Sequence, residues 1–174
     1  NKKLALGMAS LKVDQSLGKF AATVDLGLGK RAEEFSYNDN GFLAYLKQAY
    51  VSYSLTDKLK ISAGKWATHV GYELLDAPLN RNYSMSYGFS YGPFFHTGLK
   101  AEYALSGKSS FMIGIANPTD YVTTSSASKV VIAQFSTKLF EDKTTIYANY
   151  QGGNTGGNTS FTQFDVVINN IISS

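Results

Sequence analysis

The chain has 174 residues, a net charge of +3, 17% charged and 14% aromatic residues, and no cysteine. Without cysteine, disulfides, zinc–thiolate sites and cysteine nucleophiles are excluded. Lysine and arginine form no cluster longer than the pairs at 2–3 and 30–31, which argues against nucleic-acid binding. No apolar run approaches the roughly 18 residues of a membrane helix, although a barrel strand would carry no such run.

Alternating apolar and polar residues recur along the chain and predict β-strands. We expect strands over residues 4–13, 19–29, 45–55, 59–70, 96–105, 109–117, 129–140, 144–151 and 161–172. The first of these alternates poorly, and the pattern does not assign its two faces. A short helix is compatible with the polar connection at 30–44.

The connections between these strands alternate between short and long. The short ones are 14–18, 56–58, 106–108 and 141–143, and the long ones are 30–44, 71–95, 118–128 and 152–160. The segments SLTDKLKIS, ALSGKSSFM and LFEDKTTIY also share a lysine just before a strand. Tight periplasmic turns with long outer loops are typical of up-and-down outer-membrane barrels.

The two faces of most strands differ in chemistry. One face is aliphatic and aromatic. The other holds polar or charged residues: Asp25, Lys60, Lys100, Glu102, Gln134, Lys138, Asn149 and Asp165. In a barrel the first face meets lipid and the second lines the lumen. Tyr53, Tyr103 and Phe140 lie beside short turns, where an interfacial aromatic girdle is expected.

These patterns predict an all-β fold, an antiparallel up-and-down transmembrane β-barrel. Single-chain bacterial barrels have an even strand number, whereas about nine strands are expected here. The chain also opens at NKKLALGMASLKVD without a leader and stops at NNIISS without a terminal aromatic residue. We therefore interpret residues 1–174 as a single outer-membrane barrel domain that is an incomplete portion of a larger barrel. A soluble β-sandwich shows the same alternation and stays an alternative.

Residues 64–105 carry a more specific signal. Their sequence, GKWATHVGYELLDAPLNRNYSMSYGFSYGPFFHTGLKAEYAL, resembles the putative β-barrel porin-2 family of OmpL-like outer-membrane porins. The matching motifs are QAYVSY (48–53), GK (64–65), GYE (71–73), NYS (82–84), PFFHTG (93–98) and GIAN (114–117). Such families continue Asn117 with glycine and tryptophan, whereas this chain has PTD at 118–120. The resemblance implies an outer-membrane barrel with a porin-type fold.

The long connection at 71–95 is the first candidate for a functional site. It contains Glu73, Asp76 and Arg81 and leads into His96, and charged residues at a pore neck set ion selectivity. Its aromatic content predicts that it folds inward against the lumen wall. In the alternative, Glu73 and Arg81 only pair with each other and anchor the loop.

Lysines on the predicted lumen side form a second group of candidates. Lys60, Lys65, Lys100 and Lys138 would favour anionic solutes. In the alternative, which we favour for individual residues, Glu102 or Asp25 on neighbouring strands neutralises them.

Catalytic and metal sites receive little support. Ser84, His96 and Asn82 are the residue types of an outer-membrane phospholipase, but the serine falls in a loop beside tyrosines. His69 and His96 have no ligand-spaced partner, and 152–160 lacks the acidic positions of a calcium loop. We expect neither an enzyme nor a cofactor.

The leading hypothesis is a porin-like channel for passive diffusion of small hydrophilic solutes. It would lie in the outer membrane of a Gram-negative bacterium, in contact with outer-membrane lipid. A further copy of the chain or another outer-membrane protein is a candidate partner, and nucleic acid is not. The alternatives are a closed or plugged barrel that serves as a structural subunit of an outer-membrane assembly, and a soluble binding module.

Overall fold

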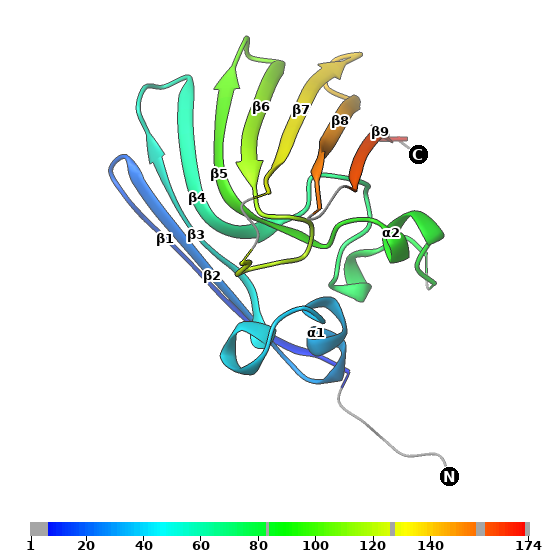
Figure 1. Ribbon diagram of the computed structural model, residues 1–174. Helices are drawn as coiled ribbons and strands as arrows, with labels where there is room; N and C mark the ends of the chain where they lie inside the picture. The colour runs from blue at the N-terminus through cyan, green and yellow to red at the C-terminus, as the bar shows by residue number, and fades with distance from the viewer. Residues whose placement is uncertain (1–6, 83, 126–127, 156–158, 173–174) are drawn as a thin grey trace.

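The strands form one sheet in which each pairs antiparallel with the next (Figure 1). The computed structural model describes residues 7–82, 84–125, 128–155 and 159–172. Their strands are β1 (Ala9–Leu17), β2 (Phe20–Leu28), β3 (Leu46–Ser54), β4 (Leu59–Ala67), β5 (Phe95–Ala104), β6 (Ser109–Ala116), β7 (Val130–Leu139), β8 (Thr144–Asn154) and β9 (Ser160–Asn170). The order in the sheet is the order in the chain. The predicted all-β, up-and-down fold is therefore confirmed.

The sheet is curled but open. Figure 1 shows β1 and β9 at its two edges, and the described residues form no pairing between them. Closing a sheet into a barrel requires its edge strands to pair, so this sheet corresponds to an incomplete barrel. A sandwich would need a second sheet packed face to face on the first, and the described strands all belong to one.

Short helices lie in the connections. They are α1 (Lys30–Phe35), the 3-10 turns η1 (Gly41–Tyr45) and η2 (Ala77–Leu79), and α2 (Tyr87–Tyr91). Within the described residues, no helix combines the length and the apolar character that crossing a membrane requires.

The first hairpin differs from its prediction. β1 continues to Leu17 and the turn follows at Gly18 and Lys19, so the predicted turn at 14–18 is wrong. Gly18 has a φ of 59°, which suits a two-residue hairpin turn. The resulting register pairs Val13 with Val24 and assigns the faces that the pattern left open. Residues 4–6 of the predicted strand lie outside the described residues.

The predicted loop at 152–160 also begins too early. β8 extends to Asn154 and β9 starts at Ser160. Glycine is needed inside this strand because a Cβ on Gly153 would lie 2.4 Å from the carbonyl oxygen of Lys129. Gly153 therefore marks close backbone approach inside a strand rather than a turn.

The outer face of the sheet is apolar and exposed. Its side chains include Val13, Val24, Val51, Leu99, Ile113, Ile115, Val131, Phe135, Phe164, Val166 and Ile168. Tyr53 and Tyr103 lie on the same face beside short turns. Large apolar side chains on a continuous exposed face are typical of a lipid-facing surface.

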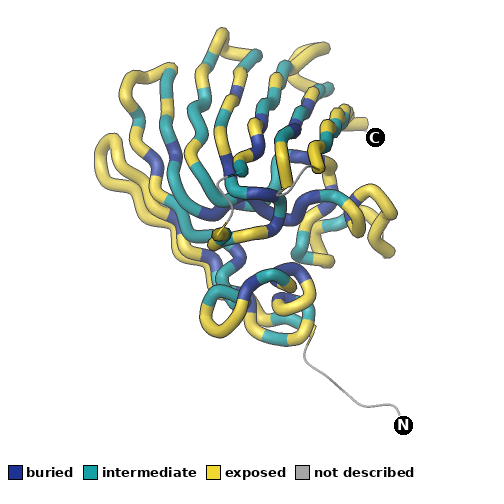
Figure 2. The backbone as a smooth tube through the Cα atoms, viewed as in Figure 1, coloured by how far each residue is buried: buried dark blue, intermediate teal, exposed yellow. Residues whose placement is uncertain are grey.

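Two clusters of buried side chains lie toward the end with the long connections. One joins Phe35, Phe89, Phe94 and Phe95, with Leu75 and Val122 packed against it. The other joins Trp66, Met112, Val130 and Ile132, with Tyr50 and Phe161 beside it. Figure 2 shows this burial around the segments that follow β4, whereas the short turns at the opposite end are exposed.

Candidate functional site

The inner face of the sheet carries polar side chains that are joined across neighbouring strands. The hydroxyls of Ser52 and Ser62 lie 2.8 Å apart on β3 and β4. On the far side, Asn149 accepts a bond from Gln134 at 2.7 Å and donates one to Asp165 at 2.7 Å. Because buried polar groups need hydrogen-bond partners, this network lets the face remain polar where it is covered.

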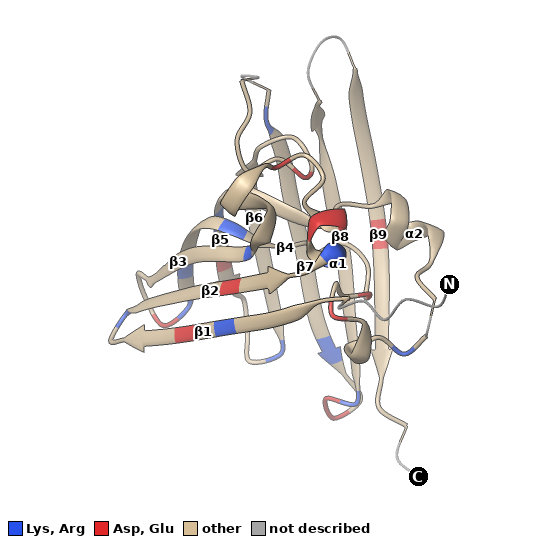
Figure 3. Ribbon diagram, turned by 90° about the horizontal axis from the view of Figure 1, so that it is seen from below, with Lys and Arg blue, Asp and Glu red and all other residues tan. Residues whose placement is uncertain are grey.

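Glu102 neutralises two of the predicted lumen lysines. Lys60 and Glu102 are paired in register, with Nζ and Oε2 3.0 Å apart, and Lys100 Nζ lies 3.7 Å from the other carboxylate oxygen. Lys138 is exposed near a short turn, opposite Thr145, and has no ion pair among the described residues. Acidic and basic positions also lie side by side on β1 (Figure 3).

A second charge cluster ties the long connection at 68–94 to the wall. Lys47 of β3, only 7% exposed, lies 3.3 Å from Asp25 of β2 and 2.9 Å from Asp76. Ser10 of β1 also donates to Asp76, at 3.4 Å. A bulge between Asp25 and Leu26 shifts the β2–β3 register at this point. The cluster therefore brings two predicted carboxylates together around a lysine that the sequence did not single out.

We call residues 68–94 the crossing loop because it reaches both sides of the open sheet. Near its start, the backbone N–H of Gly71 donates to Asp165 of β9 at 2.9 Å. Further along, Asp76 is bound to Lys47 of β3, and Arg31 of α1 donates to the carbonyl of Leu75 at 3.0 Å. The crossing loop therefore folds inward, as its aromatic content predicts.

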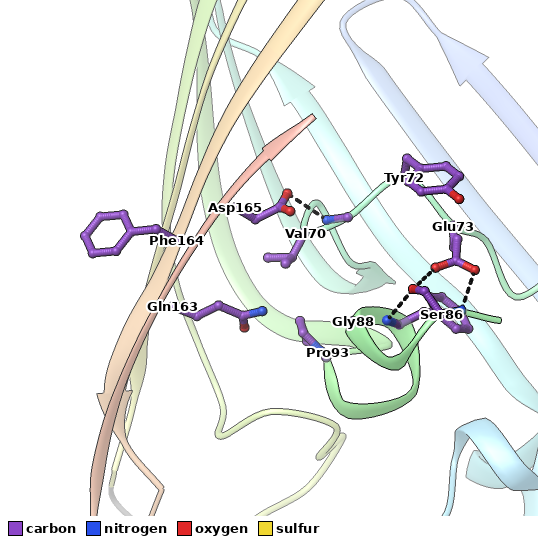
Figure 4. Close-up of a pocket in the computed structure, with 12 residues that line it drawn as sticks. Val70, Tyr72, Glu73, Ser86, Gly88, Pro93, Gln163, Phe164 and Asp165 are labelled. Carbon is purple, nitrogen blue, oxygen red and sulfur yellow. Dashed lines mark hydrogen bonds between the residues drawn. The ribbon is translucent and has the colours of Figure 1, made fainter. Parts of the chain in front are cut away.

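A cavity of ≈ 200 Å³ lies between the crossing loop and β9 (Figure 4). Gln163 and Asp165 face it from the strand, whereas Phe164 points to the opposite side of the sheet. Glu73, 6% exposed, accepts bonds from the backbone N–H of Ser86 at 3.0 Å and from the Ser86 hydroxyl. Glu73 thus anchors the loop through Ser86 rather than through Arg81.

Arg81 lines a different hollow. This hollow has a volume of ≈ 250 Å³ and is also lined by His69, Tyr72, Gln134, Tyr147 and Asn169. Arg81 is exposed and forms no ion pair within the described part of the chain. Its guanidinium therefore borders the hollow without a carboxylate partner among the described residues.

The two histidines, His69 near the start of the crossing loop and His96 of β5 just after its end, are close neighbours. Their ring centroids are 5.0 Å apart. His96 is 2% exposed and its Nε2 hydrogen-bonds to Thr68 at 3.1 Å, while His69 Nε2 lies 3.3 Å from the carbonyl oxygen of Tyr150. Burial is the main cause that lowers the pKa of His69 below 6.5, so this side chain is neutral at pH 7.

Lys65 lies apart from the other predicted lumen lysines. In the register it shares a side of β4 with Ile61 and Ala63, and it is paired with Ala49 and Thr97. Its side chain is 2% exposed, because the segments that contain Asp39 and Phe95 cover it. Lys65 is therefore part of the packing between the long connections.

The sequence of the chain is similar to one known protein family. A family model described as putative beta-barrel porin-2, OmpL-like, matches residues 1–174. The chain belongs to this porin-2 family. No match was found among curated proteins or among solved structures. The porin-2 family assignment spans the whole chain, whereas the close resemblance noticed in the sequence was centred on 64–105.

The hydrolase alternative finds no support in this porin-2 family member. The hydrogen bonds of His96 and Asn82 go to residues other than Ser84. His96 bonds to Thr68, and Asn82 donates to the hydroxyl of Tyr72 at 3.0 Å. The described residues also contain no group of three or more metal-ligating side chains.

Some residues that organise the site escaped the sequence analysis. Lys47, Asp39 and Ser86 carried no signal beyond their residue type, because their partners are distant in the chain. Asp120 had a weak signal, since it falls where the chain departs from the glycine and tryptophan expected after Asn117.

Proposed function

We propose that the chain is a single barrel domain of an outer-membrane channel through which small hydrophilic solutes diffuse passively, without enzymatic activity. The observation that carries this proposal is the separation of the two faces of one sheet. Val131 and Ile113 are among the exposed apolar residues outside, while Gln134 and Asn149 belong to the polar network inside. Lipid outside and water inside would satisfy both faces. Membership of a porin-like family supports the same proposal.

The same observations support a proposed location. We place the protein in the outer membrane of a Gram-negative bacterium, with the apolar face against lipid. The open sheet supports a larger closed barrel in which further strands, or strands of a partner, pair with β1 and β9. A second copy or another outer-membrane protein stays a candidate partner.

Conductance in planar bilayers tests the channel directly. The full-length protein, refolded into lipid, is expected to produce stepwise current increments at low voltage. A liposome swelling assay is the second test. Small neutral sugars added outside should enter liposomes that carry the protein and swell them, whereas liposomes without the protein should not swell. Absence of current at every voltage, with a folded barrel shown by heat-modifiable electrophoretic mobility, would reject the channel.

One observation favours a closed or plugged barrel as a second candidate. Trp66, Met112 and Ile132 form a buried apolar cluster on the inner face, and the crossing loop spans the sheet beside it. If the rest of the barrel leaves no space around this cluster, the protein would act as a structural subunit. A stoichiometric partner that co-purifies, together with absence of single-channel current, would favour this candidate.

A further inference from the structure

One buried carboxyl joins the connections that follow β2, β4 and β6. Asp120 is 2% exposed, and its Oδ1 accepts the backbone N–H groups of Phe94 at 2.7 Å and Phe95 at 3.2 Å. Its Oδ2 lies 3.3 Å from the hydroxyl of Tyr37. Asn38 also donates to the backbone carbonyl of Asp120, at 3.1 Å. Three segments far apart in the chain therefore converge on a single side chain.

The surroundings of this carboxyl are not charge-balanced. Lys65 Nζ lies 3.5 Å from Oδ2 of Asp39, and both side chains are almost fully buried. The ammonium also lies 3.7 Å from the ring centroid of Phe95. The titratable groups that act on Asp120 are thus Lys65 and the hydroxyl of Tyr37, with Asp39 beside Lys65 and Tyr121 near Tyr37. The cluster holds two carboxyl groups and one ammonium.

A buried charge without a partner is costly, so a proton on one carboxyl would balance the cluster. Asp39 is the carboxylate that pairs with Lys65, whereas the hydrogen bonds of Asp120 come from uncharged donors. Asp120 is therefore the group that takes the proton.

We propose that Asp120 is a proton-operated clasp: protonation fastens the segments around Tyr37, Phe94 and Asp120 to one another, and loss of the proton loosens them. The geometry accommodates the proton without a lost bond. Oδ1 keeps both backbone N–H groups, while Oδ2 becomes a donor to the oxygen of the Tyr37 hydroxyl. An ionised carboxylate, in contrast, gains hydration when the segments separate.

The direction of the pH effect follows from linkage. Burial, outweighing the hydrogen bonds from Phe94 and Phe95, raises the pKa of Asp120 from 3.8 to about 6. The closed form thus holds the proton more tightly than the open form does. Its advantage is complete below pH 3.8 and is lost as pH rises through about 6. The opening equilibrium should increase roughly 100-fold between these limits.

Hydrogen–deuterium exchange on the full chain, folded in lipid, tests the clasp. The exchange rates of the Phe94 and Phe95 amides are measured at about pH 5 and about pH 7.5. The intrinsic rate at the same pH is divided by each measured rate, which gives the protection. Wild-type protection should fall about tenfold between these values. Asp120→Asn keeps Oδ1 as an acceptor and offers Nδ2 to Tyr37, so its protection should be high at both. Asp57→Asn, in an exposed turn at the opposite end, is the matched control and should follow wild type.

Two outcomes would overturn the clasp: wild-type protection that does not change with pH, or a pH dependence that survives in Asp120→Asn. Tyr37→Phe provides a second variant, in which protection should fall at about pH 5 because Oδ2–H loses its acceptor. Unchanged protection in Tyr37→Phe would also contradict the proposed bond. Exchange is read without any transport assay, so failure of the channel proposal and failure of the clasp remain distinguishable.

Discussion

Lys60 and Glu102 lie directly opposite each other on β4 and β5, with Nζ and Oε2 3.0 Å apart, and Lys100 approaches the same carboxylate. Glu102 thus offsets the charge of two lysines on the inner face. Both Lys60 and Glu102 retain partial exposure, with side chains 47% and 33% exposed, so their charges remain accessible to water.

Removal of this carboxylate should make the channel more selective for anions. Glu102→Gln leaves Lys60 and Lys100 without their shared carboxylate, while the side chain keeps nearly the same shape. We expect the anion-to-cation permeability ratio to rise roughly twofold or more, as the field of one unit charge at about 8 Å in water predicts. The reversal potential in a salt gradient measures this ratio. Glu141→Gln, in an exposed turn, serves as the control and should leave it unchanged.

Lys47 should be important for stability because it is the buried cation between Asp25 and Asp76. Lys47→Met removes the cation and leaves two carboxylates facing each other, at a cost of about 3–5 kcal/mol in the free energy of unfolding. Urea-induced unfolding in lipid vesicles measures the loss. The triple variant Lys47→Met, Asp25→Asn and Asp76→Asn should recover most of it, and a failure to recover would show that packing dominates.

The close approach of β5 and β6 predicts that Gly98 tolerates no larger side chain. A Cβ at this position would lie 2.1 Å from the carbonyl oxygen of Ile115, whereas one at Gly107 meets no atom within 4 Å. Gly98→Ala should therefore destabilise the barrel by about 1–3 kcal/mol, and Gly107→Ala should change little. Equal stability of the two variants, measured by the same unfolding assay, would contradict the close contact between the strands.

Acid should loosen the crossing loop at His69. This pH dependence is opposite to that of Asp120, where acid fastens the segments to one another. Burial lowers the pKa of His69, so the folded protein favours its neutral form, and stability contributed here falls as pH drops below 6.5. Exchange of the Gly71 amide, which is bonded to Asp165, reports this change. His69→Gln should remove the pH dependence at Gly71 while leaving that of Phe94 intact.

The strand order and the paired lysines were predictable because they depend on local alternation. The period of two places Lys60 and Glu102 on one face, and tight turns set adjacent strands in register. Lys65 was different. Alternation puts it on the side of Ile61, and only Asp39 and Phe95, brought together by folding, explain how its charge is accommodated.

The errors in the first and last hairpins have a common physical origin. The glycines at 152–153 favour a turn by residue type, yet they lie inside β8 and allow close strand packing. The polar residues within 14–18 favour a turn, yet Asp14 lies in β1, faces inward and accepts a bond from Thr23 at 2.6 Å. In a sheet with a polar inner face, polarity alone does not distinguish a turn from a strand.

The bond between Gly71 and Asp165 joins residues 94 positions apart, whereas every described strand pairs with its immediate neighbour in the chain. Successive hairpins can therefore be added one at a time, each closing a short stretch of chain. The crossing loop cannot reach its final anchor until β9 is in place. Formation of this contact would consequently follow the pairing of β9 with β8. It would be a late step of assembly that can be measured separately from the pairing of the strands.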